Sequence, residues 1–206
     1  MVKLYVEGGG DASTLKSECR RGFNEFLRKA GLDGRMPRIV ACGSRQNAFD
    51  SFCTAVKNNE DAFLLVDSEI VVNPCYQQGE PKDWQPWQHL FERDSWQKPT
   101  PAQDIHCHLM TQVMEAWFLA DRESLAHFFG SGFQETKLPA VARTIETIDK
   151  NTLYSSIQKA TAHCKSKACY GKGLHSFKIL ALLTPSKVIE CCPWAKRLVD
   201  TLLESL

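Results

Sequence analysis

The chain lacks the cysteine spacings that build structural zinc sites and disulfide frameworks. It has nine cysteines, an odd number, and no two of them form a Cys-x-x-Cys pair. Cys164 and Cys169 are separated by four residues, and Cys191 and Cys192 are adjacent, which is neither zinc-ribbon nor zinc-finger spacing. We therefore expect reduced thiols that pack as small apolar side chains in a reducing cytoplasm.

Long hydrophobic runs are also missing. No apolar stretch approaches the roughly 18–20 residues that a membrane span needs. Residues 1–6 run directly into a predicted strand and do not resemble a secretory signal. We expect a cytoplasmic protein without a membrane partner. With 43% hydrophobic and 24% charged residues, the composition is that of a globular domain.

The net charge is only +1, so the total gives no sign of nucleic-acid binding. The distribution is uneven, however. Residues 151–206 contain eight Lys and Arg against three Asp and Glu, whereas residues 1–150 contain 17 against 21. This asymmetry is compatible with a metal site beside a phosphate-binding surface, and equally with a solvated helical face that carries lysines.

Hydrophobic periodicity predicts alternating strands and helices in the first third of the chain. Strands are expected at residues 3–7, 38–42 and 62–67, with helices at 13–30 and from 44 onward. A fourth strand is expected at 105–112. Further helices are expected at 114–119, 121–128, 153–163, 176–183 and 193–203. The order predicts an α/β fold: a four-stranded, mostly parallel sheet flanked by helices.

We expect an α/β core at residues 1–130 and a helical C-terminal part at 131–206, packed on the same domain. Within the core, residues 70–104 form an insertion with five of the nine prolines and three of the five tryptophans, Trp84, Trp87 and Trp96. Such a long loop is usually functional or disordered. The tryptophans favour packing or recognition over disorder.

Carboxylates are expected to converge at one edge of this sheet. Glu7 ends the first strand, and Asp67 ends the third, with Glu69 two residues further on. Ligands of open parallel sheets bind beyond the carboxyl ends of the strands, and residues two apart in extended backbone point the same way. Convergent carboxylates suit Mg²⁺ or Mn²⁺. The alternative is that they only end strands or cap helices at a wet edge.

Three glycines follow Glu7 directly. Gly8 to Gly10 could let backbone approach a phosphate at the start of the next helix, so Gly8 and Gly10 are candidate phosphate contacts. The run is neither a Walker loop nor a dinucleotide fingerprint, because neither pattern continues in the sequence.

Three more residues are candidates further along the chain. Glu115 is the only acid in a strongly apolar stretch, so it is either exposed on one helical face or buried with a partner such as a metal or a catalytic proton. Lys172 and His175 flank a glycine turn that opens a helix, which suits a phosphate. An ordinary capped loop is the alternative for these two.

Five separated blocks together carry a resemblance. In order, they are VEGGGD (6–11), GRMPRIVACG (34–43), LVDSE (65–69), MEAWFLAD (114–121) and KGLHS (172–176). They resemble the RloG-like family, a domain of unknown function (DUF4276), over essentially the whole chain. That family is similar to Toprim domains, which have a Rossmann-like core, a Glu after strand one and an Asp-x-Asp pair after strand three.

The resemblance implies Mg²⁺-dependent strand breakage or joining. It gives Glu7 the place of the Toprim glutamate and Asp67 that of the first Asp, with Glu69 replacing the second. The continuation into Ile70 and the Trp/Pro insertion departs from topoisomerase-like members. Relatives lie near restriction and phage-defence genes, commonly with an ABC-type or AAA ATPase.

The expected function is therefore a Toprim-like, Mg²⁺-dependent nuclease that acts on DNA or RNA as an effector of anti-phage defence, together with an ATPase. In it Glu7, Asp67 and Glu69 hold metal and Glu115 supports them. One alternative is a non-catalytic module that docks on the ATPase through exposed tryptophans. A third class is an enzyme that uses the same carboxylates on a small nucleotide.

Overall fold

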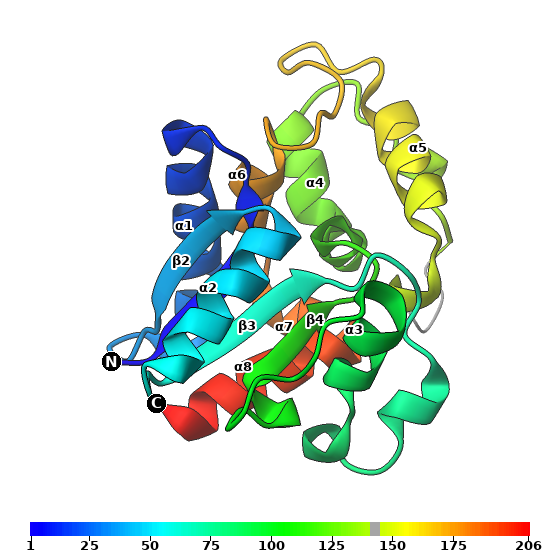
Figure 1. Cartoon of the computed structure of the whole chain (residues 1–206). Coiled ribbons are helices and arrows are strands. Elements are labelled where there is room, and N and C mark those ends of the chain that lie inside the picture. Colours follow the sequence, from blue (N-terminus) through cyan, green and yellow to red (C-terminus); the bar gives the residue numbers. More distant parts are fainter. Residues whose placement is uncertain (141–144) are drawn as a thin grey trace.

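The computed structural model describes residues 1–140 and 145–206. Its centre is a four-stranded sheet in the order β2-β1-β3-β4, in which every neighbouring pair is parallel. The chain thus has the predicted α/β, Rossmann-like fold (Figure 1). The strands are β1 (Lys3–Gly9), β2 (Arg38–Gly43), β3 (Ala62–Asp67) and β4 (Cys107–Met110).

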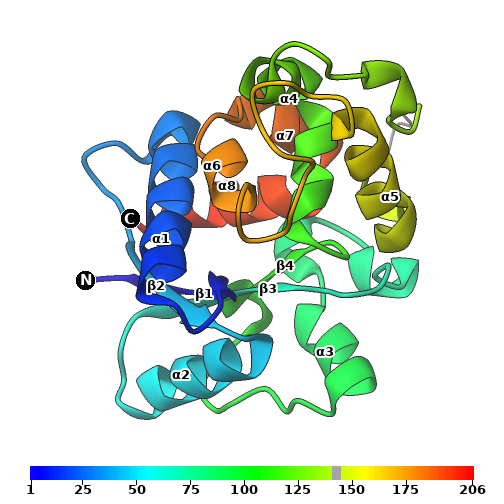
Figure 2. The same ribbon diagram turned by 90° about the horizontal axis from the view of Figure 1, so that it is seen from above.

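The two faces of the sheet are covered by different helices. The chain leaves β1 to one side to form β2 and then crosses back past β1 to form β3. Right-handed crossovers in opposite directions place their helices on opposite faces. Helices α1 (Ser13–Leu27) and α2 (Arg45–Lys57) accordingly lie on either side of the sheet (Figure 2).

The helical C-terminal part completes the core on the α1 face. Leu4, Val6 and Leu65 of the sheet are fully buried there, in one hydrophobic cluster with α1 and the C-terminal helices. These helices are α6 (Ser176–Leu180), α7 (Pro185–Cys191) and α8 (Pro193–Ser205). The sequence pattern did not predict α7. Residues 131–140 and 145–206 therefore share a core with the sheet.

The Trp/Pro insertion forms part of the second core, on the α2 face. It is ordered into short 3₁₀ turns at Pro74–Gln77 and Pro81–Asp83 and into α3 (Pro86–Asp94). All three of its tryptophans are at least 92% buried, and the Trp96 ring stacks on Phe49 with 4.4 Å between centroids. The expectation of exposed tryptophans that dock a partner is therefore wrong, because Trp87 and Trp96 pack against Phe49 of α2 and Trp84 packs against Trp194 of α8.

Several elements end earlier or wind more tightly than predicted. β4 is only four residues long, and Met114–Ala120 is a 3₁₀ helix instead of an α-helix. α4 (Arg122–Phe129) begins where expected because the Asp121 carboxylate accepts a hydrogen bond from the Ser124 N–H. α5 spans Lys150–Thr161. Shorter turns lie at Arg28–Leu32 (π), Asp104–His106, Glu135–Lys137 and Ile145–Thr147.

None of the helices in the described ranges combines the length and apolar character that a membrane crossing requires.

Candidate metal centre

Three carboxylates meet at the carboxyl edge of the sheet. β1 and β3 are direct neighbours, so their ends bring Glu7 and Asp67 together. One oxygen each from Glu7, Asp67 and Glu69 lies within 4.8 Å of the others. This is the edge where α/β sheets bind ligands, and the three side chains come together there as the sequence analysis anticipated.

Backbone hydrogen bonds fix two of these carboxylates. Oε2 of Glu7 accepts a hydrogen bond from the Asp67 N–H at 2.9 Å, and Oδ1 of Asp67 accepts one from the Met114 N–H at 2.8 Å. Each carboxylate therefore keeps one oxygen tied to the protein. Oδ2 of Asp67 faces the cation of Lys172.

Glu69 reaches the cluster by a different route from the one predicted. It does not continue the extended strand, because its φ is +67°, in the left-handed region. Its N–H donates to the carbonyl of Gln112, which also has a positive φ, at 2.8 Å. Lys150 at the start of α5 pairs with Oε2 of Glu69. Tertiary contacts, not strand alternation, direct this side chain.

Close packing around the site requires glycine at positions 8 and 43. Gly43 at the end of β2 has a φ of +87°, and a Cβ there would lie 2.6 Å from the carbonyl oxygen of Gly10. A Cβ on Gly8 would lie 2.8 Å from the Phe177 ring. Side chains at these positions would push the loop out of place. Gly8 and Gly10 line a cavity of about 250 Å³ together with Glu7, Asp67, Glu115 and Lys172.

Glu115 forms the buried side of this cavity. Glu115 is only 1% exposed, and both of its carboxylate oxygens accept hydrogen bonds. Oε1 accepts from the hydroxyls of Tyr170 and Ser176, each at 2.9 Å, and Oε2 accepts from the Tyr154 hydroxyl at 3.0 Å. Glu115 is therefore buried with partners, one of the two predicted situations, and those partners are hydroxyl groups.

Lys172 and His175 have separate surroundings. Nζ of Lys172 lies 3.8 Å from Oδ2 of Asp67 and lines the cavity. His175 does not line it. Its ring is buried between Phe128 and Phe129, and Nδ1 accepts a hydrogen bond from the Gly171 N–H at 3.2 Å. The structure therefore brings Lys172 to the carboxylates and places His175 in the supporting turn.

Arg45 is a member of this site that the sequence analysis missed. Its guanidinium donates to the Asp67 carbonyl at 2.9 Å, lies 3.6 Å from Oε2 of Glu7 and makes a two-pronged pair with Asp94 at 2.8 and 3.0 Å. It also stacks over Trp96, 4.6 Å from the ring centroid. The available signal was its position: it is the first residue of α2, two positions after the end of β2, at the same edge as Glu7.

Burial and mutual repulsion raise the pKa values of two of the three carboxylates, Glu7 and Asp67. Burial raises the pKa of Glu7 to about 7, although the Asp67 N–H and Arg45 act in the opposite direction. Burial, Glu7 and Glu115 raise the pKa of Asp67 well above its ordinary value. Burial also acts to raise the pKa of Glu69, but the hydrogen bond and charge of Lys150 outweigh it and lower that pKa.

The donor set fits a divalent cation of the Mg²⁺ or Mn²⁺ type. All three ligands are carboxylate oxygens, which hard cations prefer. The raised pKa values of Glu7 and Asp67 mean that the cations of the protein do not supply enough positive charge to hold both ionised. Elsewhere in residues 1–140 and 145–206, no comparable group of His, Cys, Asp and Glu occurs, and each cysteine is a free thiol.

The family of the chain follows from its sequence match. The family described as "Domain of unknown function (DUF4276)" matches residues 6–203, nearly the full length, and the chain belongs to that family. No curated protein and no solved structure matches it.

Proposed function

We propose that this chain is a Toprim-like, Mg²⁺-dependent nuclease that hydrolyses phosphodiester bonds in DNA or RNA. The observation that carries the proposal is the convergence of Glu7, Asp67 and Glu69 within 4.8 Å at the edge between β1 and β3. A glutamate after strand one and an acidic pair after strand three is the Toprim arrangement. Topoisomerase activity is not part of the proposal, because the Trp/Pro insertion follows Glu69 directly.

The residues of the site have distinct tasks in this proposal. Glu7, Asp67 and Glu69 hold the ion, which would activate water and neutralise charge that develops on the phosphoryl group. As the alternative to holding the ion, Glu7 can act as a general base, since burial raises its pKa to about 7 in the ion-free site. Lys172, 59% exposed at its side chain, can contact a substrate phosphate.

Glu115 and Arg45 act on the geometry of the centre. The Glu115 carboxylate holds Tyr170 and Ser176 behind the cavity and carries the negative charge that attracts Lys172. Arg45 links the backbone of Asp67 to Asp94 and so ties the end of β3 to α3. Both are positioning residues under this proposal.

The cellular role is proposed from the RloG-like resemblance. We infer an effector of prokaryotic anti-phage defence in the cytoplasm, working with an ABC-type or AAA ATPase. The non-catalytic alternative has lost its suggested contact surface, since Trp84, Trp87 and Trp96 are buried. It stays as one outcome of the experiment below.

The experiment is a cleavage assay on purified protein, with and without the neighbouring ATPase. DNA and RNA substrates are incubated with Mg²⁺ or Mn²⁺, and wild type is compared with Glu7→Gln and Asp67→Asn. We expect cleavage by wild type and its loss in both variants. Matched controls are Glu190→Gln and Asp33→Asn, which change exposed acids that do not line the cavity and should leave cleavage unchanged.

Two results would contradict the proposal. If no substrate is cut under any condition while both variants still protect cells from phage, the chain is not a nuclease. If Mn²⁺ binding measured by calorimetry is equal for wild type and the Asp67→Asn/Glu69→Gln pair, these carboxylates are not the metal site.

A further inference from the structure

One stretch of the chain carries several lysines and no acidic residue. Residues 150–189 contain seven lysines and no Asp or Glu. Three of these lysines have carboxylate partners elsewhere in the fold: Lys150 with Glu69, Lys172 with Asp67, and Lys187 with Asp121 and Glu123. The other four make no ion pair in the described part of the chain.

Lys165 and Lys167 are exposed members of this second group. They lie on the loop between α5 and α6, which projects beyond the carboxyl ends of the strands (Figure 1). Lys167 lies 4.7 Å from the centroid of the Phe128 ring. Lys167 also contributes to lowering the pKa of His175, after burial and Lys178, so positive charge gathers around that buried ring.

The loop is held in place by several specific contacts. The Lys165 N–H donates to the Ser131 carbonyl at 3.1 Å, and the Ser166 hydroxyl donates to the Phe129 carbonyl at 2.8 Å. Gly132 packs so closely that a Cβ there would lie 2.1 Å from the His163 carbonyl oxygen. These contacts therefore hold the backbone of the loop that carries the two lysines in place relative to the cavity.

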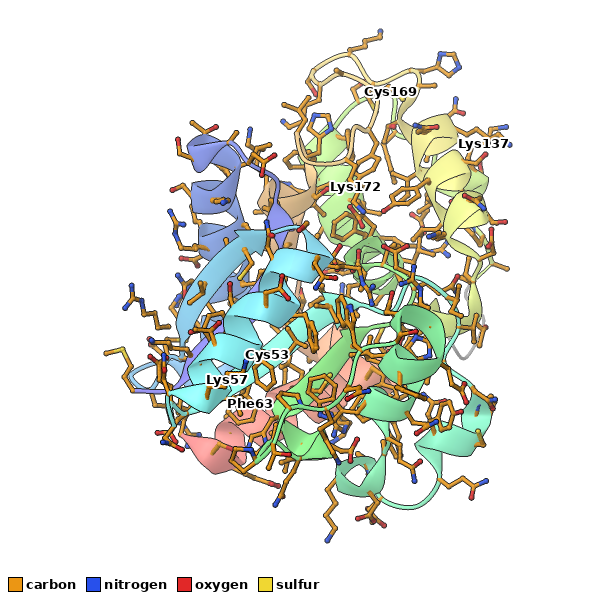
Figure 3. All side chains as sticks on the ribbon, viewed as in Figure 1. Cys53, Lys57, Phe63, Lys137, Cys169 and Lys172 are labelled. Atoms are coloured by element: carbon orange, nitrogen blue, oxygen red, sulfur yellow. The ribbon has the colours of Figure 1, made fainter. Side chains whose placement is uncertain are left out.

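The inner end of the same loop reaches the carboxylate cluster. Figure 3 shows Cys169 near the outer end of the loop and Lys172 closer to the sheet. Nζ of Lys172 lies 3.8 Å from Oδ2 of Asp67. Four residues separate Lys167 from Lys172, so their Cα atoms lie at most about 18 Å apart even in a fully extended chain. Lysine side chains thus lie at both the exposed outer part of this loop and its inner end beside the candidate metal centre.

We propose that Lys165 and Lys167, with Lys172 at the inner end, form a track that binds the sugar-phosphate backbone of a nucleic acid and leads it to the carboxylates. The inference rests on the proposed nucleic-acid substrate and adds the surface that binds it. Lysines that neutralise backbone phosphates release counterions, so binding depends steeply on salt and little on sequence. Lys165 and Lys167, which make no ion pair in the described residues and stand on a loop held by its contacts with Ser131 and Phe129, suit this role.

The test measures binding without cleavage. Short fluorescein-labelled DNA and RNA oligonucleotides, single- and double-stranded, are titrated with the full chain in EDTA at several salt concentrations, with anisotropy as the readout. The variant Lys165→Gln/Lys167→Gln is compared with Lys57→Gln/Lys82→Gln. The control lysines are also exposed and make no ion pair in the described residues, and Lys57 lies at the opposite end of the sheet (Figure 3).

We expect the loop variant to bind roughly tenfold more weakly, or worse, at low salt. The slope of log affinity against log salt is negative, and its magnitude should decrease by about 1.4–1.8 in the loop variant. This decrease corresponds to the loss of two phosphate contacts. The control variant should match wild type, and Lys165→Arg/Lys167→Arg should retain binding. Equal effects of the loop and control variants, or no effect of either, would overturn the proposal. So would displacement of the oligonucleotide by polyglutamate as efficient as that by unlabelled oligonucleotide.

The design separates this inference from the nuclease proposal. A chain that binds through these lysines but cuts nothing refutes the nuclease and keeps the track. A chain that cuts, with binding indifferent to the lysines, refutes the track and keeps the nuclease.

Discussion

Replacing Lys172 by Gln should tighten metal binding while impairing cleavage. The ammonium group lies 3.8 Å from Oδ2 of Asp67 and so repels any cation that enters the cluster. Removing it leaves the three ligands in place and takes away a competing charge. Because the same lysine is expected to contact substrate phosphate, the tighter metal site should still be a poorer nuclease.

The magnitude follows from the distance and the exposure. Two unit charges about 4 Å apart interact by about 1 kcal/mol in water and about 4 kcal/mol at the effective dielectric of a protein surface. The side chain of Lys172 is 59% exposed, whereas that of Asp67 is 5% exposed, so solvent screening keeps the effect near the lower limit. A competition of about 1–1.4 kcal/mol corresponds to a roughly five- to tenfold lower Kd for Mn²⁺.

Isothermal titration calorimetry with Mn²⁺ measures this change directly. The titration is run at alkaline pH, above the pKa of about 7 that burial gives Glu7. Lys57→Gln removes one exposed lysine away from the cavity and should leave the Kd unchanged. An unchanged or higher Kd in Lys172→Gln would refute the reasoning that this lysine competes with the ion.

Three further predictions concern pH, the glycine loop and the insertion. Metal-free protein should lose stability as pH rises from about 4.5 to about 7, because folded Glu7 holds its proton more tightly than Glu7 of the unfolded chain does. Thermal melts of Glu7→Gln should lack this contribution. The same pH dependence of stability in wild type and Glu7→Gln would contradict the prediction. Gly43→Ala should lower Mn²⁺ affinity in calorimetry, since its Cβ would lie 2.6 Å from a loop carbonyl. Gly34→Ala, also at positive φ but with open space around it, should leave the affinity unchanged. Equal losses in the two variants would argue against the packing explanation. Trp87→Ala should cost about 3–5 kcal/mol of unfolding free energy in urea titrations, and Phe91→Ala in the same helix, 49% exposed, should cost far less; similar costs would mean that the insertion contributes little to the core.

Local patterns in the sequence were enough to predict the sheet and the edge at which the site lies. Continuous apolar runs such as residues 62–66 of β3 identify strands covered on both faces. Strand-helix alternation implies parallel pairing. Together these placed Glu7 and Asp67 at one edge, because all carboxyl ends of a parallel sheet point the same way. The reason given for Glu69 was wrong, since its backbone is left-handed and not extended.

Long-range contacts decided the rest, and no local period encodes them. The tryptophans of the insertion are buried against α2 and α8, and these contacts join segments that are far apart in the chain. Glu115 has hydroxyl partners from Tyr154, Tyr170 and Ser176, which are 39 to 61 residues away in the chain.

The sequence by itself determined the sheet, the acidic ends of β1 and β3 and the basic character of residues 150–189, because periodicity and composition are local properties. Only the tertiary structure decided which cations face those acids. Arg45, Lys150 and Lys172 come from three separate elements, and side-chain proximity across elements depends on packing. The same packing raises the pKa of Glu7 and Asp67 and leaves the charge deficit that a divalent ion would fill.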